Sequence, residues 1–386
     1  MPLQAERLAK NFVQLCEIDS PSRSEGRLAS FLKGLFATEF RAEILEDDSR
    51  TVTGSDTGNL VVRIPGKSGG APPFFCNCHL DVVEPAIGVK VRRRGDTFTS
   101  AGSTVLGADD KAGIAMLVEM ARWLKEDDRL HAPLEFVFTT CEETGLRGAK
   151  NFDFSLVRAN NGYALDSAGL DLAVFAAPAA NHFTAIVHGV AAHAGLHPEN
   201  GINAIQLASQ AMANLSLGRL DEESTANIGV IVGGKATNIV PETVSIEGEV
   251  RSHNLEKLAR YTESIREIFQ QTIDGFDGPP AQPGGFPRRA QLQFLVEEQF
   301  PAMRLADQHP VLQRLRRAAV TLNRKLDFNV AGGGSDANIF TSHGLPTAIL
   351  GTGMTDVHTT DESVTLDAMV RTTQLLVALY SAALEE

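Results

Sequence analysis

The chain has 386 residues, of which 43% are hydrophobic and 22% charged, with a formal net charge of −13 at pH 7. This length exceeds that of an ordinary single domain, so we expect two domains with substantial cores. An acidic chain without a Lys/Arg cluster is not expected to bind nucleic acid or an anionic membrane. The sequence has no stretch of roughly 20 apolar residues that would span a bilayer, and residues 1–7 lack the pattern of a secretory signal.

Cysteine usage indicates a reducing, cytoplasmic environment. The four cysteines are Cys16, Cys76, Cys78 and Cys141. They are too few in so long a chain to form a disulfide framework. Alternate residues of a strand face opposite ways, so Cys76 and Cys78 are expected to point away from Asn77 and His79 and to act as small buried hydrophobes.

The first part of the chain alternates between predicted helices and strands. Helical periodicity covers 3–16 and 25–40, an amphipathic helix is predicted over 111–125, and strands are predicted over 60–64, 73–78, 134–140 and 162–165. Strands that alternate with helices predict an α/β fold, with a mostly parallel mixed sheet flanked by helices.

A different pattern occupies residues 180–300. The expected order is strand 182–190, helix 201–216, strands 226–233 and 244–252, helix 254–273 and strand 291–299. This βαββαβ order predicts a ferredoxin-like domain. The α/β pattern resumes after Pro301, so we expect a discontinuous α/β domain (1–179 and 301–386) with a second domain (180–300) inserted into it.

Acids and histidines follow the predicted strands at several places. His79 and Asp81 come directly after strand 73–78, and their spacing places both on one side of the chain. Asp81 is expected to accept the imidazole N–H of His79 and so orient the ring. Alone, a His and an Asp at a strand end are most often ordinary turn residues.

Two adjacent acids open the helix predicted over 111–125, within the segment Gly107-Ala108-Asp109-Asp110-Lys111-Ala112-Gly113. An isolated Asp at a helix start is usually an N-cap. A pair of acids between glycines is less common, and it suits a carboxylate shared by two cations at the sheet edge.

Glu142 and Glu143 follow the strand 134–140, so their carboxylates are expected to face the crevice at the sheet edge. One can bind a metal while its neighbour takes a proton from water. Asp166 follows another strand, and His358 lies near the C-terminus. Together these histidines and carboxylates fit a two-metal site. Imidazole ligands favour zinc, and manganese or cobalt suit the same ligand types.

This ordered set of motifs resembles the peptidase T and aminoacylase family of co-catalytic zinc peptidases, over nearly the whole chain. The resemblance implies two Zn²⁺ per subunit, with His79 and Asp166 on one, Glu143 and His358 on the other, and Asp109 shared by both. It implies that Asp81 orients His79 and that Glu142 is the general base and then acid. It also implies a cis peptide bond after Asp109.

The same resemblance makes the α/β domain (1–179 and 301–386) the catalytic domain and the inserted domain (180–300) a lid or dimerisation domain. It also implies roles for residues of this lid and of a Gly-rich loop. His193 resembles the lid histidine that stabilises the tetrahedral oxyanion, often from a partner subunit. Asn238 and Arg251 resemble lid residues that bind substrate, and Arg suits a carboxylate. Gly333 and Ser335, in Gly332-Gly333-Gly334-Ser335-Asp336, resemble a loop that shapes the substrate pocket. An Arg at a strand end or an Asn before Pro is more usually a surface or turn residue, and a Gly-rich loop is often only a flexible turn.

Three functions remain open at this stage. The first is a peptidase T-like aminopeptidase acting on di- or tripeptides. The second is an N-acyl-amino-acid deacylase or carboxypeptidase with the same metal centre. The third is a catalytically silent metal- or ligand-binding module, against which the intact Glu142 argues. The sequence leaves open whether the chain is a monomer or a homodimer that pairs through its lid.

Overall fold

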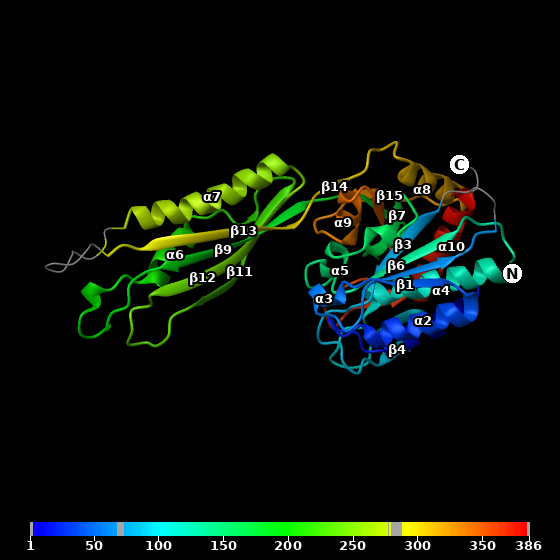
Figure 1. Cartoon of the computed structure of the whole chain (residues 1–386), viewed down its shortest axis with the longest axis horizontal. Helices are drawn as coiled ribbons and strands as arrows, with labels where there is room; N and C mark the ends of the chain where they lie inside the picture. The colour runs from blue at the N-terminus through cyan, green and yellow to red at the C-terminus, as the bar shows by residue number, and fades with distance from the viewer. Residues whose placement is uncertain (1–2, 68–72, 277, 279–287, 384–386) are drawn as a thin grey trace. The chain divides into compact units, whose positions relative to one another are not determined.

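The computed structural model describes residues 3–67, 73–276, 278 and 288–383. It divides into two compact units, which are coloured along the chain in Figure 1. The first contains Met1–Ala177 and Met303–Glu386, and the second contains Pro178–Ala302. The expected boundaries each lie two residues from these positions.

The first unit is built on a mixed sheet with the strand order β1-β2-β6-β3-β7-β16-β8-β14, and β15 also pairs with β8. Its strands are β1 (Glu43–Glu46), β2 (Leu60–Ile64), β3 (Phe74–His79), β6 (Leu134–Thr139), β7 (Gly162–Ser167), β8 (Leu172–Ala177), β14 (Met303–Arg304), β15 (Asp327–Val330) and β16 (Thr347–Gly351). The neighbours β6, β3, β7 and β16 run parallel, whereas β1, β2 and β14 pair antiparallel. The α/β class and the mixed sheet are therefore as predicted.

Helices cover both faces of this sheet. They are α1 (Ala5–Cys16), α2 (Gly26–Phe40), α3 (Arg50–Thr53), α4 (Ala108–Glu126), α5 (Arg147–Lys150), α8 (Pro310–Thr321), α9 (Asp336–Ser342) and α10 (Leu366–Ala382). One core joins α1, α2, α4, α8 and α10 to the sheet face that carries Cys76 and Cys78. On the opposite face Phe75 packs against Phe340 of α9, with ring centroids 5.0 Å apart. A short 3₁₀ turn, Phe154–Leu156, packs beside that second core.

Helix α4 differs from the amphipathic helix expected over 111–125. Nearly every residue from Ala108 to Ala121 is buried, because α1, α10 and β3 surround the helix. Even Glu119 is inaccessible, and it is paired with Arg7 of α1 at 2.8 Å. A helix in this position is part of the core rather than its cover.

The second unit, here called the lid, is a five-stranded antiparallel sheet over the described residues, with helices on one face. Its elements are β9 (Ala179–His188), α6 (Ala204–Ala213), β10 (Gly218–Arg219), β11 (Ser224–Gly233), β12 (Thr243–Ser252), α7 (Leu255–Asp274) and β13 (Gln291–Phe300), plus a 3₁₀ turn at Pro198–Asn200. The sheet order β10-β11-β12-β9-β13 contains the ferredoxin-like arrangement predicted from the βαββαβ pattern. The core of the lid includes Phe183, Ile246 and Phe269.

The first unit also contains a small second sheet. Strands β4 (Val91–Arg94), β5 (Thr97–Ser100) and β17 (Ser363–Thr365) form the order β17-β5-β4.

All four cysteines are buried and free, as expected for small apolar side chains. No helix in the described ranges is both long and apolar enough to cross a membrane.

Candidate metal centre

The predicted ligands gather at the carboxyl ends of the parallel strands. His79 is the last residue of β3, Asp166 lies near the end of β7, and Glu143 follows β6. Asp109 lies at the start of α4, where its backbone is not yet helical. His358 comes from the loop between β16 and β17. The topology places these residues together because the ends of adjacent parallel strands share one edge of the sheet.

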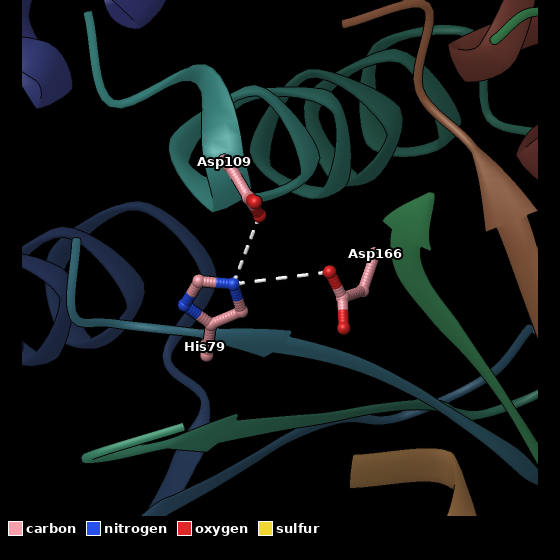
Figure 2. A group of neighbouring side chains, drawn as sticks. All are labelled: His79, Asp109 and Asp166. Carbon is pink, nitrogen blue, oxygen red and sulfur yellow. Dashed lines mark hydrogen bonds and ion pairs between the residues drawn. The ribbon is translucent and has the colours of Figure 1, made fainter. Parts of the chain in front are cut away.

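Asp109 occupies the middle of this group. Its Oδ1 lies 3.0 Å from His79 Nε2, and its Oδ2 lies 3.2 Å from His358 Nε2. Asp166 Oδ1 lies 3.9 Å from the same His79 nitrogen. Figure 2 shows the side chains of His79, Asp109 and Asp166 pointing toward one another from β3, α4 and β7. The two oxygens of Asp109 therefore face two different histidines.

The second group consists of Asp109, Glu143 and His358. Glu143 Oε1 lies 3.1 Å from His358 Nε2, and one ligand atom from each of the three residues falls within 4.8 Å of the others. The side chain of His358 is about half exposed, whereas that of Glu143 is nearly buried. The same closeness holds for His79, Asp109 and Asp166. Nitrogen and carboxylate donors at these spacings fit two cations with a shared Asp109, and zinc is among the metals that this donor set suits.

The charges of the metal-free cluster are strongly coupled. Burial opposes protonation of His79, but the hydrogen bond and negative charge of Asp109 outweigh it and raise the pKa of His79 well above its usual value. Hydrogen bonds to Asp109 and Glu143 raise the pKa of His358 to about 10. Burial favours the neutral form of Asp109, yet its bonds with His358 and His79 lower its pKa below the usual range. The two imidazoles thus occupy positions that favour a positive charge.

Glu142 is a different kind of acid from Asp109. Burial and the nearby negative charge of Asp166 raise the pKa of Glu142 well above its usual value. One of its carboxylate oxygens also approaches a group formed with His79 and Glu143. A buried carboxylate with a raised pKa beside a metal-ligand cluster is typical of a general base or acid.

Asp81 has a different set of partners from the one expected. His79 Nδ1 lies 2.9 Å from the backbone carbonyl of Asp81 but 3.7 Å from its carboxylate. The carboxylate instead accepts the backbone N–H of Glu142 at 2.9 Å and of Glu143 at 3.2 Å. Ser22 donates to the same carboxylate at 2.6 Å. The backbone of residue 81 therefore orients the imidazole, while its side chain holds the turn that carries Glu142 and Glu143.

Several buried acids around the cluster were not predicted from the sequence. Burial raises the pKa of Asp336 to about 6, and the side chain of this residue contacts Thr139. Glu25 accepts the backbone N–H of Cys141 at 2.9 Å, next to Glu142. Burial also raises the pKa of Asp110, which joins Asp109 through a cis peptide bond as expected. Asp110 and Asp336 lie in motifs that the sequence analysis singled out, whereas Glu25 lies in none of them.

The Gly-rich loop has a clear structural role at Ser335. The Ser335 hydroxyl is buried and caps α9, and Asn338 completes a capping box. Gly333 is partly exposed in the preceding loop. A pocket role for Gly333 and Ser335 therefore stays a prediction, and the cap alone explains the serine.

The three predicted lid residues lie in the second unit, in two places. The exposed His193 forms a β-bridge with Ile239, and Ala194 donates to the carbonyl of Asn238 at 3.0 Å. His193 and Asn238 are thus brought together. Arg251 lies near the other end of the lid sheet, where its guanidinium pairs with Glu249 at 2.9 Å. Their roles toward substrate stay predictions.

An α/β sheet with clustered acids and histidines along its edge, interrupted by a ferredoxin-like insertion, defines a candidate metallohydrolase. The family model for peptidase family M20/M25/M40 matches residues 75–382. The chain therefore belongs to this peptidase family and is a hydrolase.

Known relatives match the chain over essentially its full length. The Bacillus subtilis protein YqjE, itself described as uncharacterized, is 37% identical over 379 residues, which cover 98% of each chain. The solved structure of aminopeptidase PepT from Bacillus cereus is 37% identical, with a TM-score of 0.87 and full coverage of both chains. A tripeptidase from Staphylococcus aureus is 31% identical with a TM-score of 0.92, again over all of both chains.

Proposed function

We propose that this peptidase is a two-metal aminopeptidase that removes the N-terminal residue of tripeptides. The observation that carries the proposal is Asp109, whose two oxygens face His79 and His358 separately. The B. cereus and S. aureus structures, an aminopeptidase and a tripeptidase, support this substrate class because they match over the whole chain.

The proposed metals are two Zn²⁺ ions, and Mn²⁺ or Co²⁺ suit the same donors. His79 and Asp166 would hold one, Glu143 and His358 the other, and Asp109 both. When bound, such ions supply Lewis acidity that activates water and polarises the scissile carbonyl. The imidazoles must be neutral to serve as ligands, so loading displaces their protons.

The protein supplies the proton transfers through Glu142. Its buried carboxylate accepts a proton from the attacking water and returns that proton to the leaving amine. Its position depends on the N–H bond that its own backbone makes with Asp81. Glu142 and Glu143 thus divide base and ligand roles within one short turn.

The lid is proposed to act in a homodimer. Arg251 pairs with Ala180, whereas His188 and the bridge of His193 lie at the opposite end of β9. The eight residue steps from Ala180 to His188 span about 27 Å at the usual rise of a strand. An extended tripeptide is only about 10 Å long. One lid therefore cannot offer both His193 and Arg251 to one substrate, which favours His193 acting from a partner subunit.

The substrate assignment is tested by a screen of purified enzyme with tripeptides, dipeptides and N-acetyl-amino acids. Each substrate is assayed after chelation and again after zinc is restored. We expect zinc-dependent release of the N-terminal residue from tripeptides and little turnover of acylated amino acids. Preferred cleavage of N-acetyl-amino acids would make the chain a deacylase instead. Full metal occupancy without turnover would indicate a silent binding module.

The cellular location proposed for this enzyme is the cytoplasm. All four thiols are free and buried, which suits a reducing compartment. Fractionation of cells that express the untagged chain tests this location, with recovery outside the cytoplasmic fraction contradicting it.

A further inference from the structure

Glu362 is a buried carboxylate in the loop that carries His358, and it accepts hydrogen bonds from backbone N–H groups of a turn distant in sequence. Its Oε2 accepts the N–H of Leu106 at 2.8 Å and of Gly107 at 2.7 Å. Its Oε1 accepts the N–H of Asp109 at 2.9 Å. The residue is 1% exposed, so these bonds are shielded from water.

The turn whose N–H groups donate these hydrogen bonds determines where Asp109 lies. Gly107 has a left-handed backbone (φ 76°), and Asp109 is not yet helical. The N–H groups of Gly107 and Asp109 take no part in the helical hydrogen bonds of α4, because the first N–H groups of a helix have no partner within it. The carboxylate of Glu362 supplies partners for three such groups at once.

The loop that carries His358 and Glu362 is closed by backbone hydrogen bonds between its two ends. Thr355 and Ser363 exchange backbone hydrogen bonds at 2.9 and 3.1 Å, so the residues between them form a compact loop that contains His358 and Glu362. His358 itself has a left-handed backbone (φ 63°) and a half-exposed side chain. Its ring pairs with Asp109 and Glu143.

We propose that Glu362 is a positioning residue that keeps the His358 loop and the Asp109 turn in register. It thereby builds the metal position formed by Asp109, Glu143 and His358. The inference rests on the two-metal function proposed above. The other position has Asp109 in common with it, but its remaining proposed ligands, His79 and Asp166, lie on strands β3 and β7, which the sheet holds in place. That position therefore depends less on Glu362.

A purely structural carboxylate provides the matched control. Glu135 at the start of β6 is also buried and accepts the backbone N–H of Arg158 and of Ala159, both at 3.0 Å. It lies at the opposite end of that strand from Glu142. Glu135 also pairs with Arg63 Nε at 2.9 Å. Glu135→Gln therefore weakens backbone bonds of the same kind, and this ion pair as well, without touching the candidate metal centre.

The test compares Glu362→Gln and Glu362→Ala with Glu135→Gln and wild type. Zinc affinity is measured for each of the two sites by chelator competition, and thermal unfolding and kcat and KM are recorded alongside. In Glu362→Gln an amide NH₂ replaces one acceptor and opposes the backbone donors. We expect one zinc to bind roughly 10- to 100-fold more weakly and the other within about twofold of wild type. We also expect kcat to recover at high zinc with KM little changed.

Other outcomes are distinguishable. Wild-type affinity at both sites in Glu362→Gln would overturn the inference, as would an equal loss at both sites or a loss matched by Glu135→Gln at the same unfolding temperature. If Glu362→Ala fails to fold, Glu362→Gln alone decides. A wild-type enzyme that binds fewer than two zinc ions would instead overturn the two-metal function itself.

Discussion

Asp109 lies between His79 and His358, with one carboxylate oxygen 3.0 Å from the first imidazole and the other 3.2 Å from the second. An amide cannot reproduce this arrangement, because only one of its two heteroatoms can act as a ligand. We predict that Asp109→Asn binds fewer than two zinc ions per chain and loses at least about 100-fold in kcat. Metal analysis after dialysis, together with steady-state kinetics, measures both.

The control for that variant is Asp361→Asn, since Asp361 is an exposed carboxylate in the same loop as His358. It removes the same formal charge without removing a predicted ligand. Two tightly bound zinc ions in Asp109→Asn would contradict the shared role of Asp109.

Glu142 is expected to move protons rather than hold metal. We predict that Glu142→Ala keeps both zinc ions while kcat falls by roughly 100- to 10,000-fold, the range for loss of a general base. The zinc content is the critical measurement, because Glu142 also approaches a group with His79 and Glu143. Loss of one zinc from Glu142→Ala would show that this residue is a ligand, and retained turnover would remove it from the mechanism.

Asp81 is expected to affect catalysis through the turn that it holds. Asp81→Ala removes the acceptor for the N–H groups of Glu142 and Glu143, so we predict a roughly 10- to 100-fold loss of kcat or zinc affinity. Ser22→Ala is the matched control, since it removes a hydroxyl donor from the same carboxylate and leaves both backbone bonds. Equal effects of the two variants would mean that the backbone bonds do not matter.

The fold and the candidate metal ligands follow from local patterns in the sequence, whereas the residues that hold those ligands in position do not. Apolar runs predicted the strands, and His79, Asp166 and Glu143 lie at or near strand ends, where the topology of a parallel sheet gathers them. The partner of the Asp81 carboxylate is a backbone turn about sixty residues away in sequence. The spacing of His79 and Asp81 suggested a nearer partner, and nothing local indicated the distant one.

Glu362 and α4 show the same limit. In sequence, Glu362 lies in a polar stretch that resembles an exposed loop, and it is buried because unpaired N–H groups of the Asp109 turn need an acceptor. An amphipathic helix was predicted over 111–125, but the polar residues Glu119 and Lys111 of α4 are buried as well. They are buried because Arg7 and the carbonyl of Ile18 supply partners for them.

Zinc binding is predicted to weaken as the pH falls. In the metal-free protein the pKa of His358 is raised to about 10, and that of His79 also lies well above its usual value. Both rings are therefore protonated near pH 7 and must each lose a proton to bind metal. Burial and the charge of Asp109 also raise the pKa of the proposed ligand Asp166 well above its usual value. Calorimetry in buffers of different ionisation enthalpy should therefore report at least about two protons released per chain. Affinity that is flat between pH 6 and pH 8 would contradict this linkage.

The proposed action of His193 from a partner subunit can be tested by mixing two inactive variants. His193→Ala lacks the lid histidine, and Glu142→Ala lacks the base. In a mixed dimer with trans action, the chain that keeps Glu142 receives His193 from its partner, so one of the two sites is intact. Random exchange makes about half of the dimers mixed, so activity should recover to about a quarter of wild type.

The matched control is His197→Ala, because His197 is another exposed lid histidine, and its ring pairs with the nearby Glu199. It should retain near-wild-type activity by itself. If His193 acts within its own chain, neither site of a mixed dimer is complete and mixing restores nothing. A solution mass equal to one chain would exclude the trans arrangement directly. His193 would then have to serve the site without Arg251. Arg251 pairs with Ala180 at the start of β9, whereas His193 comes after the other end of that strand.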